Sequence, residues 1–125
     1  GEQLIFANSD LIKSRIKNYK QMEERRIVFR IGVVYATAPE KLAAIPGMIR
    51  EIIAAEPRAR FDRAHFLSFG SSSLDFEIVY FVLSPDFLVY ADMQQAFNLE
   101  IFRRFTAAGI GFAYPTTTVI LEQGS

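Results

Sequence analysis

"RAHFLSFGSSSLDFEIVYFVL", residues 63–83, contains two β-prone runs on either side of a turn-forming segment, residues 70–73. Gly and Ser between two such runs predict a β-hairpin. In the second run, alternate residues share one face of the expected strand, namely Phe76, Ile78, Tyr80 and Val82. The opposite face is largely apolar too, so we expect burial on both sides of this strand or contact with a partner.

The segment before the hairpin predicts a strand followed by a helix. From Ile27 to Tyr35, every second residue is apolar, which is typical of a half-buried strand. Residues 38–56 then carry an apolar helical stripe of Leu42, Ile45, Ile49, Ile52 and Ile53. Thr37 with Glu40 fits a capping box, and Pro39 suits a first helical turn. We expect Pro46 to remove a backbone hydrogen bond and to kink this helix.

The segment after the hairpin predicts a long helix and a last strand. Ser84 or Asp86 can cap the helix, and Gly109 is suited to end it. Met93, Phe97, Ile101 and Phe105 recur at helical spacing between these ends. Residues 110–114, "IGFAY", then read as a strand. The order from Arg26 to Tyr114 is thus β-α-β-β-α-β, which predicts an α+β, ferredoxin-like fold with an antiparallel sheet and two helices on one face.

Composition limits the classes of protein that this chain can belong to. Its 125 residues suffice for one domain with a real core. Lys plus Arg equal Asp plus Glu at 14 each, which argues against a nucleic-acid-binding protein, usually a basic one. The absence of Cys excludes disulfides and Cys-type metal sites. No apolar run approaches the roughly 20 residues of a membrane-spanning helix.

The residues that could support catalysis or ligand binding are isolated from one another. His65 is the single histidine, and a histidine without partners is more often a surface residue of a strand than a base or a ligand. Asp86 and Asp92 fit the start of a helix better than a reactive pair. The sequence 70–75, "GSSSLD", lacks the Lys of a phosphate-binding loop and reads as a turn. We therefore expect no enzymatic activity and no catalytic, cofactor-binding or metal-binding residues.

Two surface patterns remain open to other interpretations. The aromatic run 74–81, "LDFEIVYF", could stack nucleic-acid bases, but it has neither an RNP1 match nor a basic surround, so we expect core or interface packing. Arg103 and Arg104 could join Arg25 and Arg26 in a basic patch. Acidic neighbours such as Glu100 favour an ordinary solvated face instead.

Three long segments together resemble the cytoplasmic C-terminal region of the small-conductance mechanosensitive ion channel family. They are "RRIVFRIGVVYATAPEKLAAIPGMIREII", "FDRAHFLSFGSSSLDFEIVYFVLSPDF" and "AGIGFAYPTTTVIL", which begin at residues 25, 61 and 108. The earlier "FANSDLIKSRIKNY", residues 6–19, is similar to the end of the preceding β domain in that family. Ala7 stands where the family often has Pro, so the chain departs from the family pattern at this turn.

The resemblance implies a function that residue periodicity does not show. Family members are homo-oligomeric membrane channels, typically heptamers, that open under membrane tension and release ions and small osmolytes. It also implies a division of the chain: residues 1–22 end a truncated β domain, residues 23–115 form the α/β domain, and residues 116–125 form an intersubunit strand and tail. The membrane helices would lie upstream, with this chain on the cytoplasmic side as part of a vestibule wall. Without them, we expect only weak ring assembly.

Other functions are compatible with a ferredoxin-like fold. One alternative is a regulatory domain that binds a small molecule, as ACT-type domains do. The absence of a Gly-rich bend between the first strand and the first helix weakens that interpretation. A small enzyme of the acylphosphatase kind is a further alternative, although the Gly-rich loop that would precede Arg30 is missing.

Overall fold

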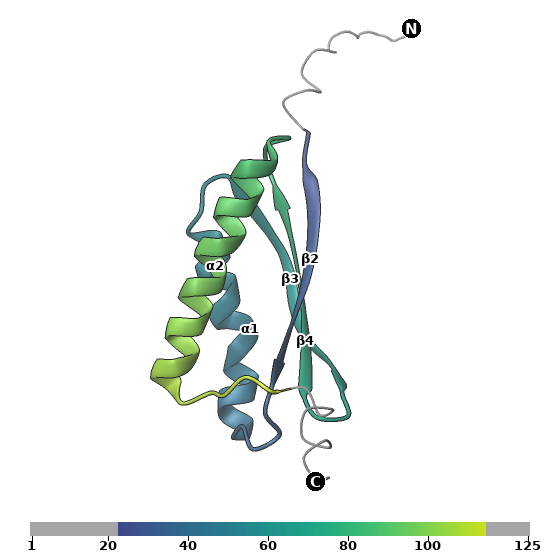
Figure 1. The fold of residues 1–125 in the computed structure, drawn as a ribbon, viewed down its shortest axis with the longest axis vertical. Helices are drawn as coiled ribbons and strands as arrows, with labels where there is room; N and C mark the ends of the chain where they lie inside the picture. The colour runs from purple at the N-terminus through teal and green to yellow at the C-terminus, as the bar shows by residue number, and fades with distance from the viewer. Residues whose placement is uncertain (1–22, 115–125) are drawn as a thin grey trace, which may run out of the picture.

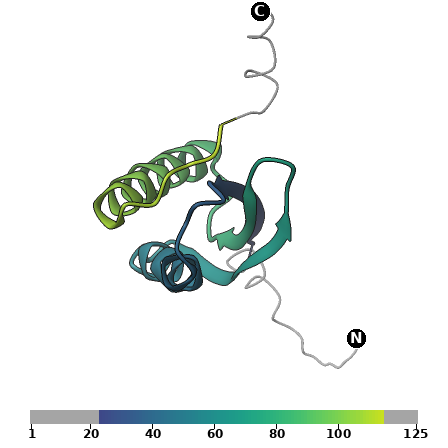
Figure 2. The same ribbon diagram turned by 90° about the horizontal axis from the view of Figure 1, so that it is seen from below.

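The computed structural model describes residues 23–114, which form three strands and two helices in the order β2 (Arg25–Val33), α1 (Pro39–Ala54), β3 (Ala59–Phe69), β4 (Leu74–Val82) and α2 (Phe87–Ala108). Both helices pack on one face of the sheet (Figures 1 and 2). The predicted α+β, ferredoxin-like arrangement is confirmed. The proposed segments 1–22 and 116–125 lie outside the described residues. Neither of the two described helices is long and apolar enough to cross a membrane.

The sheet places β4 between β2 and β3, and both pairs are antiparallel. The central position agrees with the apolar composition of β4, because a middle strand is flanked by strands on both edges and covered on at least one face. Its inward residues, from Leu74 to Val82, are buried. The pairing of β3 with β4 contains two register irregularities, at Asp62 and Leu67. The hairpin is also confirmed, because the Gly70 amide donates to the Ser73 carbonyl at 2.7 Å.

α1 begins differently from the prediction. Its N-cap is Ala38, whose side chain makes no cap hydrogen bond, and the Thr37 hydroxyl instead donates to the Val34 carbonyl at 2.6 Å. The predicted capping box is therefore wrong, because a turn after β2 uses the hydroxyl that the cap would need. Pro39 does open the helix, as predicted. The helix continues through Pro46 as one element.

α2 follows its sequence signals closely. Asp86 is the N-cap, and its Oδ1 accepts from the Leu88 amide at 3.0 Å. Ser84 supports the same turn by accepting from the Asp86 amide. Gly109 ends the helix in the left-handed region, with φ of 76°. The predicted apolar stripe of α2 is buried. It packs in one core with the buried residues of α1, namely Ile45, Ile49, Ile52 and Ile53.

The predicted last strand is reduced to a single bridge. Phe112 pairs antiparallel with Val33, flanked by bonds from the Val34 amide to the Gly111 carbonyl and from the Ala113 amide to the Gly32 carbonyl, each 3.0 Å. In this register the backbones of residues 111 and 113 face β2. Every second residue of this segment would bond to β2, so the next one after residue 113 is Pro115, which has no N–H to donate. The ladder therefore lacks a donor where it would have to continue.

Candidate functional site

Residues with catalytic potential are not brought together by the fold. His65 is exposed on β3, opposite Glu77 of β4. Asp86 caps α2, while Asp92 is exposed on that helix. Within residues 23–114, no three His, Cys, Asp or Glu side chains are grouped so that they could hold a metal ion. The turn at Gly70 uses its own amide within the hairpin, and Ser73 Oγ donates to Asp75 Oδ1, so this loop presents an acid rather than an anion cradle.

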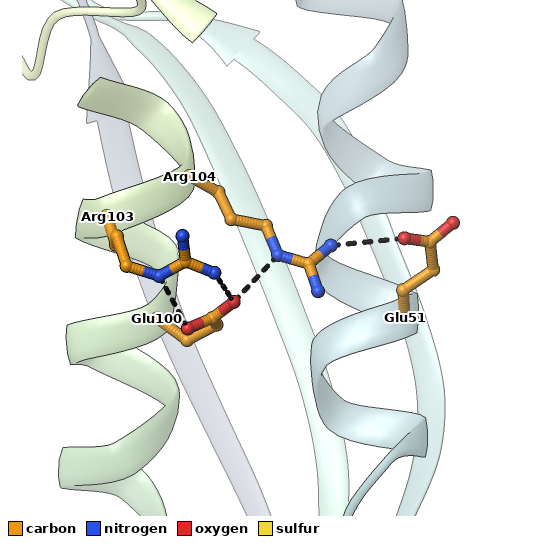
Figure 3. Close-up of polar contacts among 4 residues, drawn as sticks. All are labelled: Glu51, Glu100, Arg103 and Arg104. Carbon is orange, nitrogen blue, oxygen red and sulfur yellow. Dashed lines mark hydrogen bonds and ion pairs between the residues drawn. The ribbon is translucent and has the colours of Figure 1, made fainter. Parts of the chain in front are cut away.

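An ionic network links the two helices on the side away from the sheet (Figure 3). Arg104 of α2 donates to Glu100 on its own helix at 2.9 Å and to Glu51 of α1 at 3.1 Å. Arg103 also donates to Glu100, from Nε at 3.1 Å. These hydrogen bonds, first from Arg103 and then from Arg104, lower the pKa of Glu100 to about 2. The network keeps both arginines neutralised in a chain that has no net charge.

The alternative of a basic patch is not assembled, and the favoured interpretation of a solvated face with acidic neighbours agrees with the pairing of Arg103 and Arg104. Arg103 and Arg104 belong to the last two turns of α2, whereas Arg25 is the first residue of β2 and donates to the Pro85 carbonyl at 3.1 Å. The C-terminal end of α2 and the start of β2 lie at opposite ends of the domain (Figure 1). A groove of about 560 Å³ adjoins the helix network, and half of its lining consists of small residues such as Ala44, Gly47 and Ala108. This groove therefore combines paired charges with small apolar side chains, without an unpaired cation from Arg103 or Arg104.

The sheet face away from the helices is less apolar than the sequence indicates. Val79 is fully buried within the sheet, and the Arg60 guanidinium lies 4.2 Å from the Phe81 ring centroid. Arg60 also pairs with Glu24, and Arg30 with Glu77 at 2.9 Å. Of the two alternatives predicted for β4, burial on both sides or contact with a partner, the described residues agree with burial for Val79, while Phe81 is partly covered. Arg60 of the neighbouring strand covers the ring of Phe81.

Two clusters of exposed apolar residues lie at the edges of the sheet. Beside β2, a groove of about 370 Å³ is lined by Ile31, Asn98, Ile101, Phe102 and Phe112. Phe112 stacks on Phe102 and Phe105 of α2, with ring centroids 5.7 and 5.1 Å away. Leu99 and Phe102 nevertheless remain 64% and 60% exposed.

At the opposite edge, Leu67 and Phe69 end β3 with 60% and 74% of their surface exposed. Phe69 packs edge-on against Phe66, with ring centroids 5.1 Å apart. Sequence reasoning missed both edge clusters. The available signal was that Leu99 and Phe102 fall outside the buried stripe of α2.

Comparison with known proteins identifies relatives for nearly the whole chain. Residues 27–112 match the family described as "Mechanosensitive ion channel MscS, C-terminal". The small-conductance mechanosensitive channel MscMJ of Methanocaldococcus jannaschii is 36% identical over 121 residues, which are 96% of this chain and 35% of that protein. An uncharacterized MscS family protein of Aquifex aeolicus is 32% identical over 119 residues, 93% of this chain and 32% of the relative.

A third relative is named as a large-conductance channel, whereas the first is named as a small-conductance channel. The large-conductance mechanosensitive channel MscMJLR of Methanocaldococcus jannaschii is 29% identical over 125 residues, 96% of this chain and 35% of that protein. The chain thus spans about one third of the length of these relatives.

Proposed function

The chain belongs to the MscS family of mechanosensitive ion channels, and on this premise we propose that it forms the vestibule wall on the cytoplasmic side of a channel that opens under membrane tension. The open channel would release ions and small osmolytes. The observation that carries the proposal is the family match over residues 27–112, which covers almost all of the ferredoxin-like domain. The names of the two Methanocaldococcus relatives support the same activity.

The proposed whole protein is a homo-oligomer, a heptamer in the intact channel, held in the cell membrane by helices upstream of this chain. In this arrangement residues 1–22 end the preceding β domain, residues 23–115 form the α/β domain, and residues 116–125 provide an intersubunit strand and tail. The role of the domain is structural rather than catalytic. Asp86 is used to cap α2, and His65 and Asp92 are exposed on different elements, which supports that role.

Electrical recording from membrane patches tests this proposal. The longer protein that carries this chain, expressed in cells without other mechanosensitive channels, should give currents that rise when suction increases membrane tension. Patches from cells that express only the 125-residue chain should remain silent, because the proposed pore lies upstream. A longer protein that reaches the membrane but conducts at no tension below patch rupture would contradict the proposed function.

A further inference from the structure

The two apolar edge clusters lie at the same level of the sheet. Val33 of β2 bridges Phe112 on one side and pairs with Leu74 of β4 on the other, and Leu74 in turn pairs with Phe69 of β3. Phe112 and Phe69 therefore stand at opposite ends of one row of residues. Val33 and Leu74, which lie between them, are both buried in the core under the helices. The two clusters thus share a level, and this row belongs to the helix-covered side of the sheet.

The β2 edge offers a receptor for an apolar side chain. Within residues 23–114, the backbone of Arg25–Ile31 pairs only with β4 on its inner side. The groove beside this edge is lined by four apolar residues and one amide, Asn98, with no charged side chain. Its volume of about 370 Å³ falls in the range of roughly 300–1,000 Å³ that is typical of binding pockets.

The β3 edge offers the matching projection. In the described part of the chain, β3 pairs only with β4, so its outer edge is free of strand partners. Phe69 is the most exposed large apolar side chain of this strand. The unpaired backbone groups of an exposed edge strand are a template for association with another chain, and here the strand also ends in an exposed apolar side chain.

We infer that Phe69 of one copy of this chain inserts into the groove between β2 and α2 of the next copy. β2 and β3 are both antiparallel to β4, so they run in the same direction. Rotation about an axis along the strands brings β3 of one copy beside β2 of the next without a change of level. Phe69 then lies level with Phe112, whose segment bridges the end of β2 and whose ring lines the groove. The contact joins two different surfaces, and such head-to-tail contacts form a ring where the rotation between copies closes.

A second copy of the chain is favoured over other occupants, because the β2 edge has an apolar groove and the β3 edge has an exposed apolar side chain. The chain carries no net charge, so neighbouring copies do not repel each other strongly. The inference rests on the proposed function in one respect, since a channel family supplies the requirement for a ring. Its geometry comes from the strand register alone.

Cross-linking of the full 125-residue chain tests this contact, and the absence of Cys removes background reaction. Ser68→Cys, next to Phe69, is mixed with Leu99→Cys, beside the groove, and treated with a short bis-maleimide. Leu88→Cys is the matched control, because Leu88 lies on the same helix and is also 64% exposed. Linked dimers should form with Leu99→Cys well above the Leu88→Cys level.

A second pair of variants tests the role of the aromatic side chain. Phe69→Ser should lower the yield of the 68–99 link about tenfold, because the burial of one aromatic side chain is lost. Phe87→Ser, which removes another exposed phenylalanine, should leave the yield unchanged. If the yield of the 68–99 link in Phe69→Ser stays as far above the 68–88 yield as it is with Phe69 present, the insertion of Phe69 is overturned.

The outcomes separate this contact from the proposed channel activity. A 68–99 yield no higher than the 68–88 yield, including no link at all, overturns the inference even if the longer protein conducts under tension. Predominant 68–68 or 99–99 links would also overturn it, since they indicate a two-fold dimer. A selective 68–99 link without tension-gated current would support the contact and contradict only the proposed function.

Discussion

Arg104 of α2 reaches across the helix pair to Glu51 of α1, with 3.1 Å between Nη1 of Arg104 and Oε1 of Glu51. The same guanidinium contacts Glu100 through Nε at 2.9 Å (Figure 3). Glu100 therefore lies at the branch point of a network that includes Arg103 and, through Arg104, the neighbouring helix. Its negative charge holds two cations close together, which should make the network sensitive to pH.

We expect the contribution of Glu100 to stability to disappear in acid. The pKa of Glu100 is lowered from 4.5 to about 2 in the folded chain by hydrogen bonds from Arg103 and Arg104. The unfolded chain then binds the proton more readily, so this contribution is complete above about pH 4.5 and is lost as the pH falls toward 2. Solvent exposure and added salt should keep the effect small.

Urea unfolding of the unmodified chain and of Glu100→Gln between pH 7 and pH 2 measures this effect. The difference in unfolding free energy should shrink as the pH falls below 4.5. Asp92→Asn on the same helix is the control, because Asp92 has no ion-pair partner within residues 23–114. A difference that stays constant down to pH 2 would contradict the assignment to Glu100.

Tyr80→Phe should destabilise the domain by about 1 kcal/mol, a typical net contribution of a hydrogen bond. Tyr80 is fully buried, and its hydroxyl donates to Oε1 of Gln94 at 2.7 Å. The ring contacts of Tyr80 with Phe29 and Phe97 survive the change, so the loss reports the hydroxyl. The midpoint of urea unfolding should fall while the slope stays constant. Equal loss in Tyr90→Phe, whose hydroxyl has no hydrogen-bond partner in the described residues, would argue against this explanation.

Pro46→Ala should stabilise the domain by about 1–2 kcal/mol. Pro46 lies inside α1, where a proline removes one backbone hydrogen bond, and alanine is about 3 kcal/mol more favourable in a helix interior. Greater freedom of the unfolded chain offsets part of this gain. Thermal unfolding measures the change. Gly47→Ala is the control, since a Cβ there meets nothing within 4 Å, and it should add about 0.5–1 kcal/mol. A destabilised Pro46→Ala would show that α1 depends on the proline ring for packing.

Hydrogen exchange tests the proposal that residues 116–121 form an intersubunit strand. The amides of this β-prone segment should exchange fast in the isolated 125-residue chain, because the proposed strand finds its partners in neighbouring copies. They should be protected in the longer, membrane-assembled protein. Light scattering should show whether the isolated chain is monomeric at micromolar concentration. Slow exchange in a monomer would mean that the segment pairs within its own domain, and fast exchange in both proteins would contradict the intersubunit strand.

Local patterns in the sequence determined the elements of this domain. The stripes of Ile45, Ile49 and Ile53 and of Met93, Phe97 and Ile101 predict the two helices, because helical periodicity is a property of a single segment. Turn residues predict the hairpin, and Gly109 predicts the end of α2 for the same reason. The order of these elements was enough to indicate a ferredoxin-like fold.

Pairings between distant segments were decided only by the tertiary structure. Thr37 could cap α1 by its local sequence, yet its hydroxyl bonds to Val34 once β2 ends in a turn. The sequence leaves open what covers the face of β4 that carries Phe81, and the structure places Arg60 from the neighbouring strand over its ring. Local sequence cannot predict such contacts, because they depend on which strands become neighbours.

The same reason explains why the candidate interface was absent from the sequence predictions. Phe69 and Phe112 are 43 positions apart (112 − 69), and nothing in either local pattern relates them. The pairings of Val33 and Leu74 place them in one row, at opposite edges of the sheet. The sequence by itself determined that these phenylalanines lie in or next to extended segments. The long-range register decided that one projects from the sheet at the level where the other lines a groove.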